Sequence, residues 1–211
     1  MPRVELVTSI LTAYSSNVSP RVHKVESVLN REVILKLVET SAYQELPAVL
    51  AQTTNFSLYA NGTGLTPGLR LFYGDGQAYV GPKAPSFVSQ AVNITLAEQG
   101  DKYAFVVTPE RTMSWTAQPS MMVDMNSDAF EPVEFIFGNE TAATSSSASG
   151  FGLYGGWAFH KNEAGTVEMK FYATKTNESD IYLIRWNSKA TKSVDGISVS
   201  LRTLAPVAIT A

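Results

Sequence analysis

The sequence lacks cysteine, and it holds only two histidines, His23 and His160. Without thiols the chain forms no disulfide, no thiolate nucleophile and no cysteine metal site. No stretch of 18 apolar residues is present, so we expect no membrane-spanning segment. Charged residues are also scarce, at 17%, and the net charge is −3. This balance argues against a nucleic-acid-binding protein, which normally carries a basic stripe.

Familiar catalytic and cofactor signatures are missing as well. There is no G-x-S-x-G elbow, no Walker loop and no dinucleotide-binding glycine motif. Asp124, Asn126 and Asp128 are spaced like the start of a calcium loop, but Ala129 replaces the turn glycine and Phe135 the final glutamate. The sequence therefore predicts neither a metal nor a cofactor.

Carboxylates leave one catalytic alternative open. Glu131, Glu134 and Glu168 lie on or near expected strands, and two of them could converge as a glycosidase pair. Glutamates on strands are more often part of a solvated β face. We therefore do not assign them a catalytic role.

Asparagines followed by the N-x-S/T pattern are unusually frequent. Serine and threonine make up 40 of 211 residues, so about two of the ten asparagines should fit the pattern by chance. Six do: Asn17, Asn55, Asn61, Asn93, Asn139 and Asn177. Asn17 is the weakest candidate because Pro20 follows its motif. The excess predicts a glycoprotein that is secreted or held in the secretory-pathway lumen.

The start of the chain, MPRVELVTS, has no apolar segment of the kind found in signal peptides. If the protein is secreted, we expect this sequence to be a trimmed form with an added first methionine.

From residue 55 onward the sequence has the pattern of β-structure. Short apolar runs alternate with Gly, Pro, Asn and Asp clusters about every ten residues. About a dozen such runs are present, among them VNITLA, MSWTA and FGLYGGWAF. The alternation in AVNITL places Asn93 outside and Val92, Ile94 and Leu96 inside. The sequence predicts a single-domain antiparallel β-sandwich of jelly-roll type, with TAATSSSASG (residues 141–150) as a flexible surface loop.

Residues 1–50 differ from the rest. EVILKLVETSAYQELPAVLAQ fits a helix ended by Pro47, but its β-branched content favours a strand. This N-terminal extension either packs on the sandwich or exchanges between the subunits of a homodimer. Both alternatives stay open.

FGLYGGWAFH, residues 151–160, is the strongest pocket candidate. On one continuous strand, Tyr154 and His160 would share a face, with Gly156 and Ala158 forming a notch between them. The hypothesis makes Tyr154 and His160 catalytic. The alternative is that the glycines only make room for a large side chain from a facing sheet, with Trp157 an ordinary core residue.

Arg70 is the third candidate catalytic residue. It lies in an apolar run beside Tyr73 and Asp75. Pairing with Asp75 across the Asp-Gly turn is the common outcome, whereas a buried arginine could polarise a ligand carbonyl. Aromatic residues would supply the walls of a ligand site, and the candidates are Trp157, Trp115, Tyr73 and Phe159.

Two segments resemble a known family. FSLYANGTGLTPGLRLFYGDGQAYVG and FYATKTNESDIYLIRWN are similar to segments of small, secreted, glycosylated fungal proteins of β-rich build. Some members of that family are hetero-Diels–Alderases of tropolone–humulene meroterpenoid biosynthesis. The resemblance implies a cofactor-free pericyclase of secondary metabolism that joins a tropolone o-quinone methide to humulene.

Two other functions compete with the pericyclase. One is a secreted protein that binds a carbohydrate or host ligand without catalysis, and the other is a structural wall glycoprotein. A pericyclase needs an enclosed apolar cavity for a terpene of about 15 carbons, in which two reactants are held together. A lectin-like protein needs an exposed aromatic platform with polar groups around it, and a wall protein needs neither.

Overall fold

A computed structural model describes residues 54–205 except 101, 139 and 190–194. The chain divides into two units, Met1–Gln52 and Thr53–Ala211, and all the described residues belong to the second. The helix-or-strand segment 32–52, Asn17, His23 and Asn139 lie outside the described residues.

The described residues form strands and no helix, and therefore include no helix able to cross a membrane. All the strand pairings are antiparallel. The prediction of an antiparallel all-β fold is confirmed. The strands are β1 (Tyr59–Asn61), β2 (Leu71–Gly74), β3 (Gln77–Val80), β4 (Ala91–Gln99), β5 (Ala104–Pro109), β6 (Pro119–Asp124), β7 (Phe130–Pro132), β8 (Glu134–Phe137), β9 (Ser146–Ser147), β10 (Phe151–Tyr154), β11 (Trp157–Lys161), β12 (Val167–Glu168), β13 (Phe171–Lys175), β14 (Tyr182–Asn187), β15 (Ile197–Ser198) and β16 (Ser200–Arg202).

Six strands close into a barrel. Their order is β3-β2-β4-β5-β6-β8, and β8 returns to β3 through the pair Gln77 and Glu134. Beside this pair, the Ala78 amide donates to the Val133 carbonyl at 2.9 Å, and the Phe135 amide to the Gly76 carbonyl at 2.8 Å. The predicted jelly-roll sandwich is not confirmed. Alternating apolar residues fit a sandwich and a barrel equally well, because they do not reveal whether the first and last strands pair.

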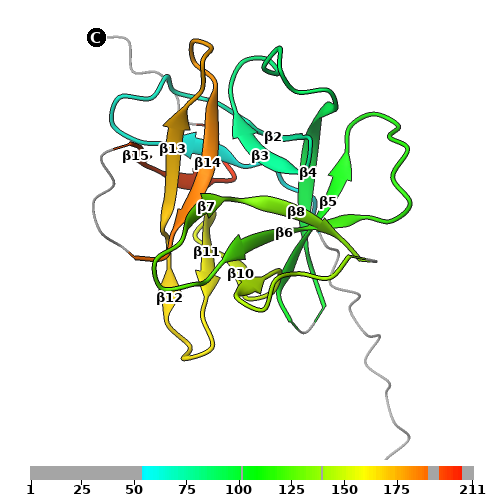
Figure 1. Cartoon of the computed structure of the whole chain (residues 1–211), viewed down its shortest axis with the longest axis vertical. Helices are drawn as coiled ribbons and strands as arrows, with labels where there is room; N and C mark the ends of the chain where they lie inside the picture. The colour runs from blue at the N-terminus through cyan, green and yellow to red at the C-terminus, as the bar shows by residue number, and fades with distance from the viewer. Residues whose placement is uncertain (1–53, 101, 139, 190–194, 206–211) are drawn as a thin grey trace, which may run out of the picture. The chain divides into compact units, whose positions relative to one another are not determined.

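The barrel continues into a flanking sheet. β14 pairs with β3 beyond the point where β8 meets it, and β13 and β15 follow in order. Figure 1 shows β13 and β14 side by side along one flank. A separate sheet has the order β1-β16-β11-β10, with β12 also paired to β11.

The interior is filled by apolar side chains. In β4, Val92, Ile94 and Leu96 are buried and Asn93 is exposed, as the alternation predicts. Phe105 from β5 stacks on Phe151 from β10, with ring centroids 5.4 Å apart, so the two sheets share one core. The barrel is thus a packed core and not a channel.

Two of the three runs named in the sequence analysis differ from single strands in the structure. MSWTA (residues 113–117) is an irregular connection between β5 and β6, where Trp115 packs half-buried against Tyr73. FGLYGGWAF is a hairpin of two strands. In both cases a local apolar run does not correspond to one strand.

The packing predicts that a buried and an exposed phenylalanine contribute differently to the stability of the fold. Phe105 is fully buried, whereas Phe87 is 53% exposed. Phe105→Ala should lower the free energy of unfolding by about 3–5 kcal/mol, because it leaves a cavity in the shared core. The same substitution at Phe87 should change it by about 0.5 kcal/mol or less. Denaturant unfolding would measure both, and equal losses would contradict this account of the core.

Candidate functional site

The segment FGLYGGWAFH is a tight β-hairpin. Tyr154 pairs with Trp157, and the Gly155–Gly156 turn joins the strands with φ angles of +56° and +83°. Two consecutive positive φ angles fit a type I′ turn, which favours glycine. Because the chain reverses here, Tyr154 lies at the tip and His160 near the open end. The predicted notch between them does not exist.

Gly152 leaves space for a neighbouring side chain. Gly152 pairs with Phe159, and a Cβ on Gly152 would lie 2.5 Å from the Phe159 ring. Glycine thus makes room for a large side chain, as the alternative interpretation proposed, but that side chain comes from the adjacent strand. Trp157 is half-buried and carries the Arg202 guanidinium over its ring at 4.1 Å.

His160 lies in the core beside two aromatic rings. It is 2% exposed, and its ring centroid lies 5.1 Å from Phe151 and 5.6 Å from Trp186. Neither imidazole nitrogen has a hydrogen bond of normal geometry within the described residues. Burial lowers the pKa of His160, while the nearby Ser149 backbone and the Glu168 carboxylate partly oppose this shift. The imidazole is therefore neutral near pH 7.

His160 also forms part of the wall of a cleft of about 880 Å³, which we call the loop cleft. Its lining comes from three separate parts of the chain: Lys102 and Tyr103, Met125 with residues 144–150, and residues 160–164. Tyr103 is 62% exposed and has a φ of +55°. Tyr103 was not among the residues expected from the sequence. The signal for it is an aromatic residue within the polar segment QGDKY.

Backbone hydrogen bonds fix the serine-rich loop over this cleft. The Gly150 amide donates to the Lys102 carbonyl at 2.8 Å, and the Phe151 amide donates to the Tyr103 carbonyl at 2.7 Å. Ser147 pairs with Val123 in the β6–β9 ladder. The segment expected to be a flexible loop is therefore held by β-type contacts at several points.

Gly150 is required where this loop crosses β11. Its φ is +86°, and a Cβ there would lie 2.5 Å from the Lys161 carbonyl oxygen. The same Cβ would lie 3.3 Å from the Nε2 atom of His160. The backbone thus passes directly beside the imidazole, which only a glycine permits.

Arg70 has partners other than the one expected. Its guanidinium contacts the Glu110 carboxylate and donates to the Ile94 carbonyl at 2.9 Å. Asp75 instead accepts hydrogen bonds from the Ser89 and Gln90 amides, each at 2.7 Å. The predicted Arg70–Asp75 pair is therefore wrong. Arg70, directly before β2, bonds to Ile94 within β4 and to Glu110 directly after β5.

Two predicted ligand residues do meet. Tyr73 and Trp115 contact each other with ring centroids 4.9 Å apart, and Phe135 and Phe137 complete the cluster. A cleft of about 550 Å³, the β8 cleft, lies beside it and is lined by Tyr73, residues 75–77, Met122, residues 134–137, residues 140–143 and Ser146. Burial raises the pKa of the Tyr73 hydroxyl.

The β8 cleft also holds a carboxyl group with altered acidity. Burial raises the pKa of Glu134, and the charges of Glu131 and Asp124 raise it further. This increases the fraction of Glu134 that carries a proton and can donate a hydrogen bond.

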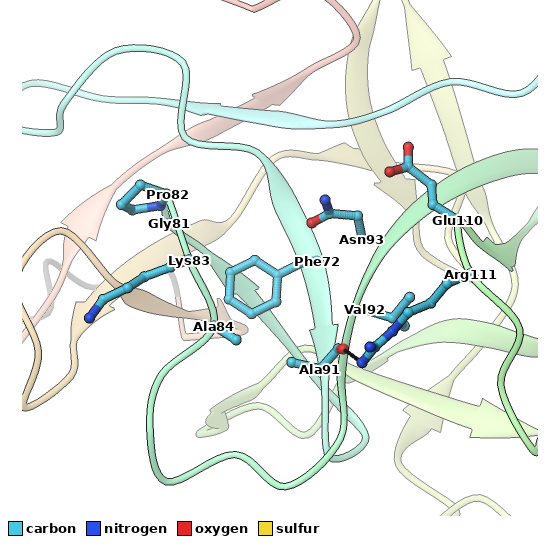
Figure 2. Close-up of a pocket in the computed structure, with 10 residues that line it drawn as sticks. All are labelled: Phe72, Gly81, Pro82, Lys83, Ala84, Ala91, Val92, Asn93, Glu110 and Arg111. Carbon is cyan, nitrogen blue, oxygen red and sulfur yellow. Dashed lines mark hydrogen bonds between the residues drawn. The ribbon is translucent and has the colours of Figure 1, made fainter.

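A third cleft, of about 420 Å³, contains a candidate glycosylation site and is named the Asn93 cleft. It is lined by Phe72, residues 81–84, residues 91–93, Glu110 and Arg111 (Figure 2). Asn55, Asn93 and Asn177 are exposed, while Asn61 is half-buried in β1. Tyr154, Trp157 and Phe159 line none of the three clefts described.

Comparisons with protein-family models, curated proteins and solved structures find no match for this chain. The two segments that carry the fungal resemblance are neighbours in the fold. The first supplies β1, β2 and β3, the second supplies β13 and β14, and β3 pairs with β14.

The buried imidazole predicts a pH effect on stability. Unfolding restores the His160 pKa to about 6.5, so below that pH the unfolded chain binds a proton that the folded chain does not. The stability contributed by neutral His160 should fall as the pH drops from about 6.5 toward the lowered folded-state pKa.

Denaturant unfolding of the wild type and His160→Gln at several pH values would measure this effect. As the pH falls from about 6.5 toward the lowered pKa of folded His160, the unfolding free energy of the wild type should decrease relative to that of His160→Gln. His23→Gln controls for the other histidine. Parallel pH profiles for the wild type and His160→Gln would show that burial does not shift the His160 pKa.

Proposed function

We propose that this protein is a secreted glycoprotein that binds a polyhydroxylated ligand, such as a carbohydrate, in the loop cleft. The observation that carries the proposal is Tyr103, an exposed aromatic ring surrounded by hydroxyl, amide and ammonium groups. This is the arrangement that a sugar-binding surface needs.

Tyr103 is suited to stacking against a sugar ring. Its side chain is exposed, while its backbone carbonyl is held by the Phe151 amide. The backbone at Tyr103 is therefore held by β10. A tyrosine ring turns about only two side-chain bonds, so it loses little conformational freedom when a ligand covers it.

Polar groups around Tyr103 can bind the hydroxyls of a sugar. The cleft presents serines from the 144–150 loop, the Lys161 ammonium and the Asn162 side chain. Hydroxyl and amide groups donate and accept, and the ammonium donates. The ring and these groups come from three separate segments of the chain, and contacts to all three would fix the orientation of the ligand.

His160 gives the cleft a buried polar group. A neutral imidazole has one nitrogen that donates and one that accepts. The Ser149 backbone lies close to this ring, and neither nitrogen makes a hydrogen bond of normal geometry within the described residues. Both nitrogens are buried, so the imidazole ring forms part of the cleft wall. In this proposal His160 lines the site and does not transfer a proton.

A matched pair of tyrosines tests the proposal. Tyr103→Ala should weaken binding of the best glycan from an array by about tenfold or more, through loss of stacking. Tyr154→Ala should leave the affinity unchanged, because Tyr154 is 76% exposed at the hairpin tip. Calorimetry would measure both. Equal affinities in the two variants, or no glycan bound by the wild type, would refute the assignment.

One set of observations favours a second candidate, the hetero-Diels–Alderase. The aromatic cluster of Tyr73, Trp115, Phe135 and Phe137 adjoins the β8 cleft, where Glu134 has a raised pKa. A hydrogen-bond donor beside aromatic walls could hold a tropolone o-quinone methide against humulene and polarise its carbonyl. The cycloaddition joins the two partners without losing an atom and needs no cofactor.

A product assay tests this candidate. The protein would be incubated with humulene and a hydroxymethyl-tropolone precursor, and adducts would be separated on a chiral column. Two results together would support the candidate. The wild type should form one enantiomer faster than a heat-treated control does, and Trp115→Ala should form it at least about tenfold more slowly than the wild type. Tyr154, His160 and Arg70 do not line the β8 cleft, so Tyr154→Ala serves as the control variant. A racemic product at the control rate would remove the candidate for these substrates.

A further inference from the structure

Asn93 occupies an unusual place for a glycosylation site. It is the third residue of β4, with Val92 and Ile94 on either side buried in the core. Its own side chain is exposed and forms part of the wall of the Asn93 cleft (Figure 2). A glycan on this residue would therefore begin inside a concave surface.

We propose that the glycan on Asn93 folds into the Asn93 cleft, so that its first sugars pack against the protein. The inference rests on the predicted N-glycosylation and is independent of ligand binding in the loop cleft. It assigns this cleft to a covalently attached carbohydrate and not to a diffusible ligand.

The lining of the cleft suits an amino sugar. Phe72 pairs with Asn93 across β2 and β4 and forms an apolar floor, and Tyr79 stacks behind its ring at 5.8 Å. Lys83 and Arg111 lie on different sides of this floor, as Figure 2 shows. Apolar and N–H groups together match the two faces of an N-acetylglucosamine ring, which carries both a hydrophobic face and acceptor oxygens.

Backbone contacts hold Asn93 in place. The Glu110 amide donates to the Asn93 carbonyl at 2.8 Å, and the Arg111 guanidinium donates to the Ala91 carbonyl. The wall that carries Arg111 is thus fastened to the same strand as Asn93. The cleft keeps its shape without help from a ligand.

Covalent attachment makes weak contacts sufficient. A sugar joined to Asn93 has an effective concentration in the cleft in the millimolar range, so each contact needs only a small free energy. Asn55 and Asn177 are exposed as well, but they line none of the three clefts described. They are therefore internal controls within the same chain.

An endoglycosidase experiment tests the inference. The full chain would be expressed in a glycosylating eukaryotic host, and site occupancy would be measured by glycopeptide mass spectrometry. An enzyme that cuts between the first two N-acetylglucosamines would then be applied to the folded protein. We expect the Asn93 glycan to be cut at least about tenfold more slowly than those on Asn55 and Asn177, because its core is covered.

A variant separates packing from simple crowding. Lys83 is exposed and pairs with Glu178, and Lys83→Ala removes this surface ion pair and opens one side of the cleft without touching the core. It should speed cleavage at Asn93 and leave cleavage at Asn55 unchanged, and Asn55 is the control for this variant because Asn177 neighbours Glu178. Asn93→Gln should lower the melting temperature of glycosylated protein but not of protein from a bacterial host. An unoccupied Asn93, equal cleavage rates at the three sites, or no effect of Lys83→Ala would overturn the inference.

Discussion

Closure of the barrel at β3 is the constraint on which the rest of the structure depends. One edge of β3 pairs with β2, and its other edge is shared, first with β8 at Gln77 and then with β14 at Tyr79 and Val80. Val133 lies at the fork. Its amide donates to the Ile184 carbonyl in β14, and its carbonyl accepts from Ala78 in β3. A fully buried valine therefore joins the barrel to the flanking sheet.

This fork explains where the clefts form. Closing β8 on β3 brings the Tyr73 and Phe135 rings together beside the β2–β3 turn, which produces the β8 cleft. The separate sheet meets the barrel through the stacked pair Phe105 and Phe151, and the loop cleft opens where the chain around Gly150 crosses from one sheet to the other. The clefts are consequences of how sheets join, and their chemistry follows from which residues lie at each junction.

The sequence predicted correctly which residues of a strand are buried, because this depends on the local alternation of apolar and polar residues. The pattern of AVNITL placed Val92, Ile94 and Leu96 inside and Asn93 outside, and the structure agrees. It could not predict that β8 returns to β3, because strand pairing is non-local. The Gly155–Gly156 pair is a hairpin signal that the sequence did contain, and taking FGLYGGWAFH as one strand led to the wrong placement of Tyr154 beside His160. The sequence could not predict the loop cleft, because its lining comes from segments more than 40 residues apart, such as those of Tyr103 and Ser147.

The central proposal is that a ligand binds in the loop cleft, whose wall includes the imidazole of His160. The most direct test is nuclear magnetic resonance of protein labelled in its two histidines, titrated with the best-binding glycan from the array. A His23→Gln variant identifies the two sets of imidazole signals. The proposal predicts that the His160 ring signals shift as the ligand saturates. Saturation of binding with unchanged His160 signals would contradict it and would place the ligand elsewhere on the protein.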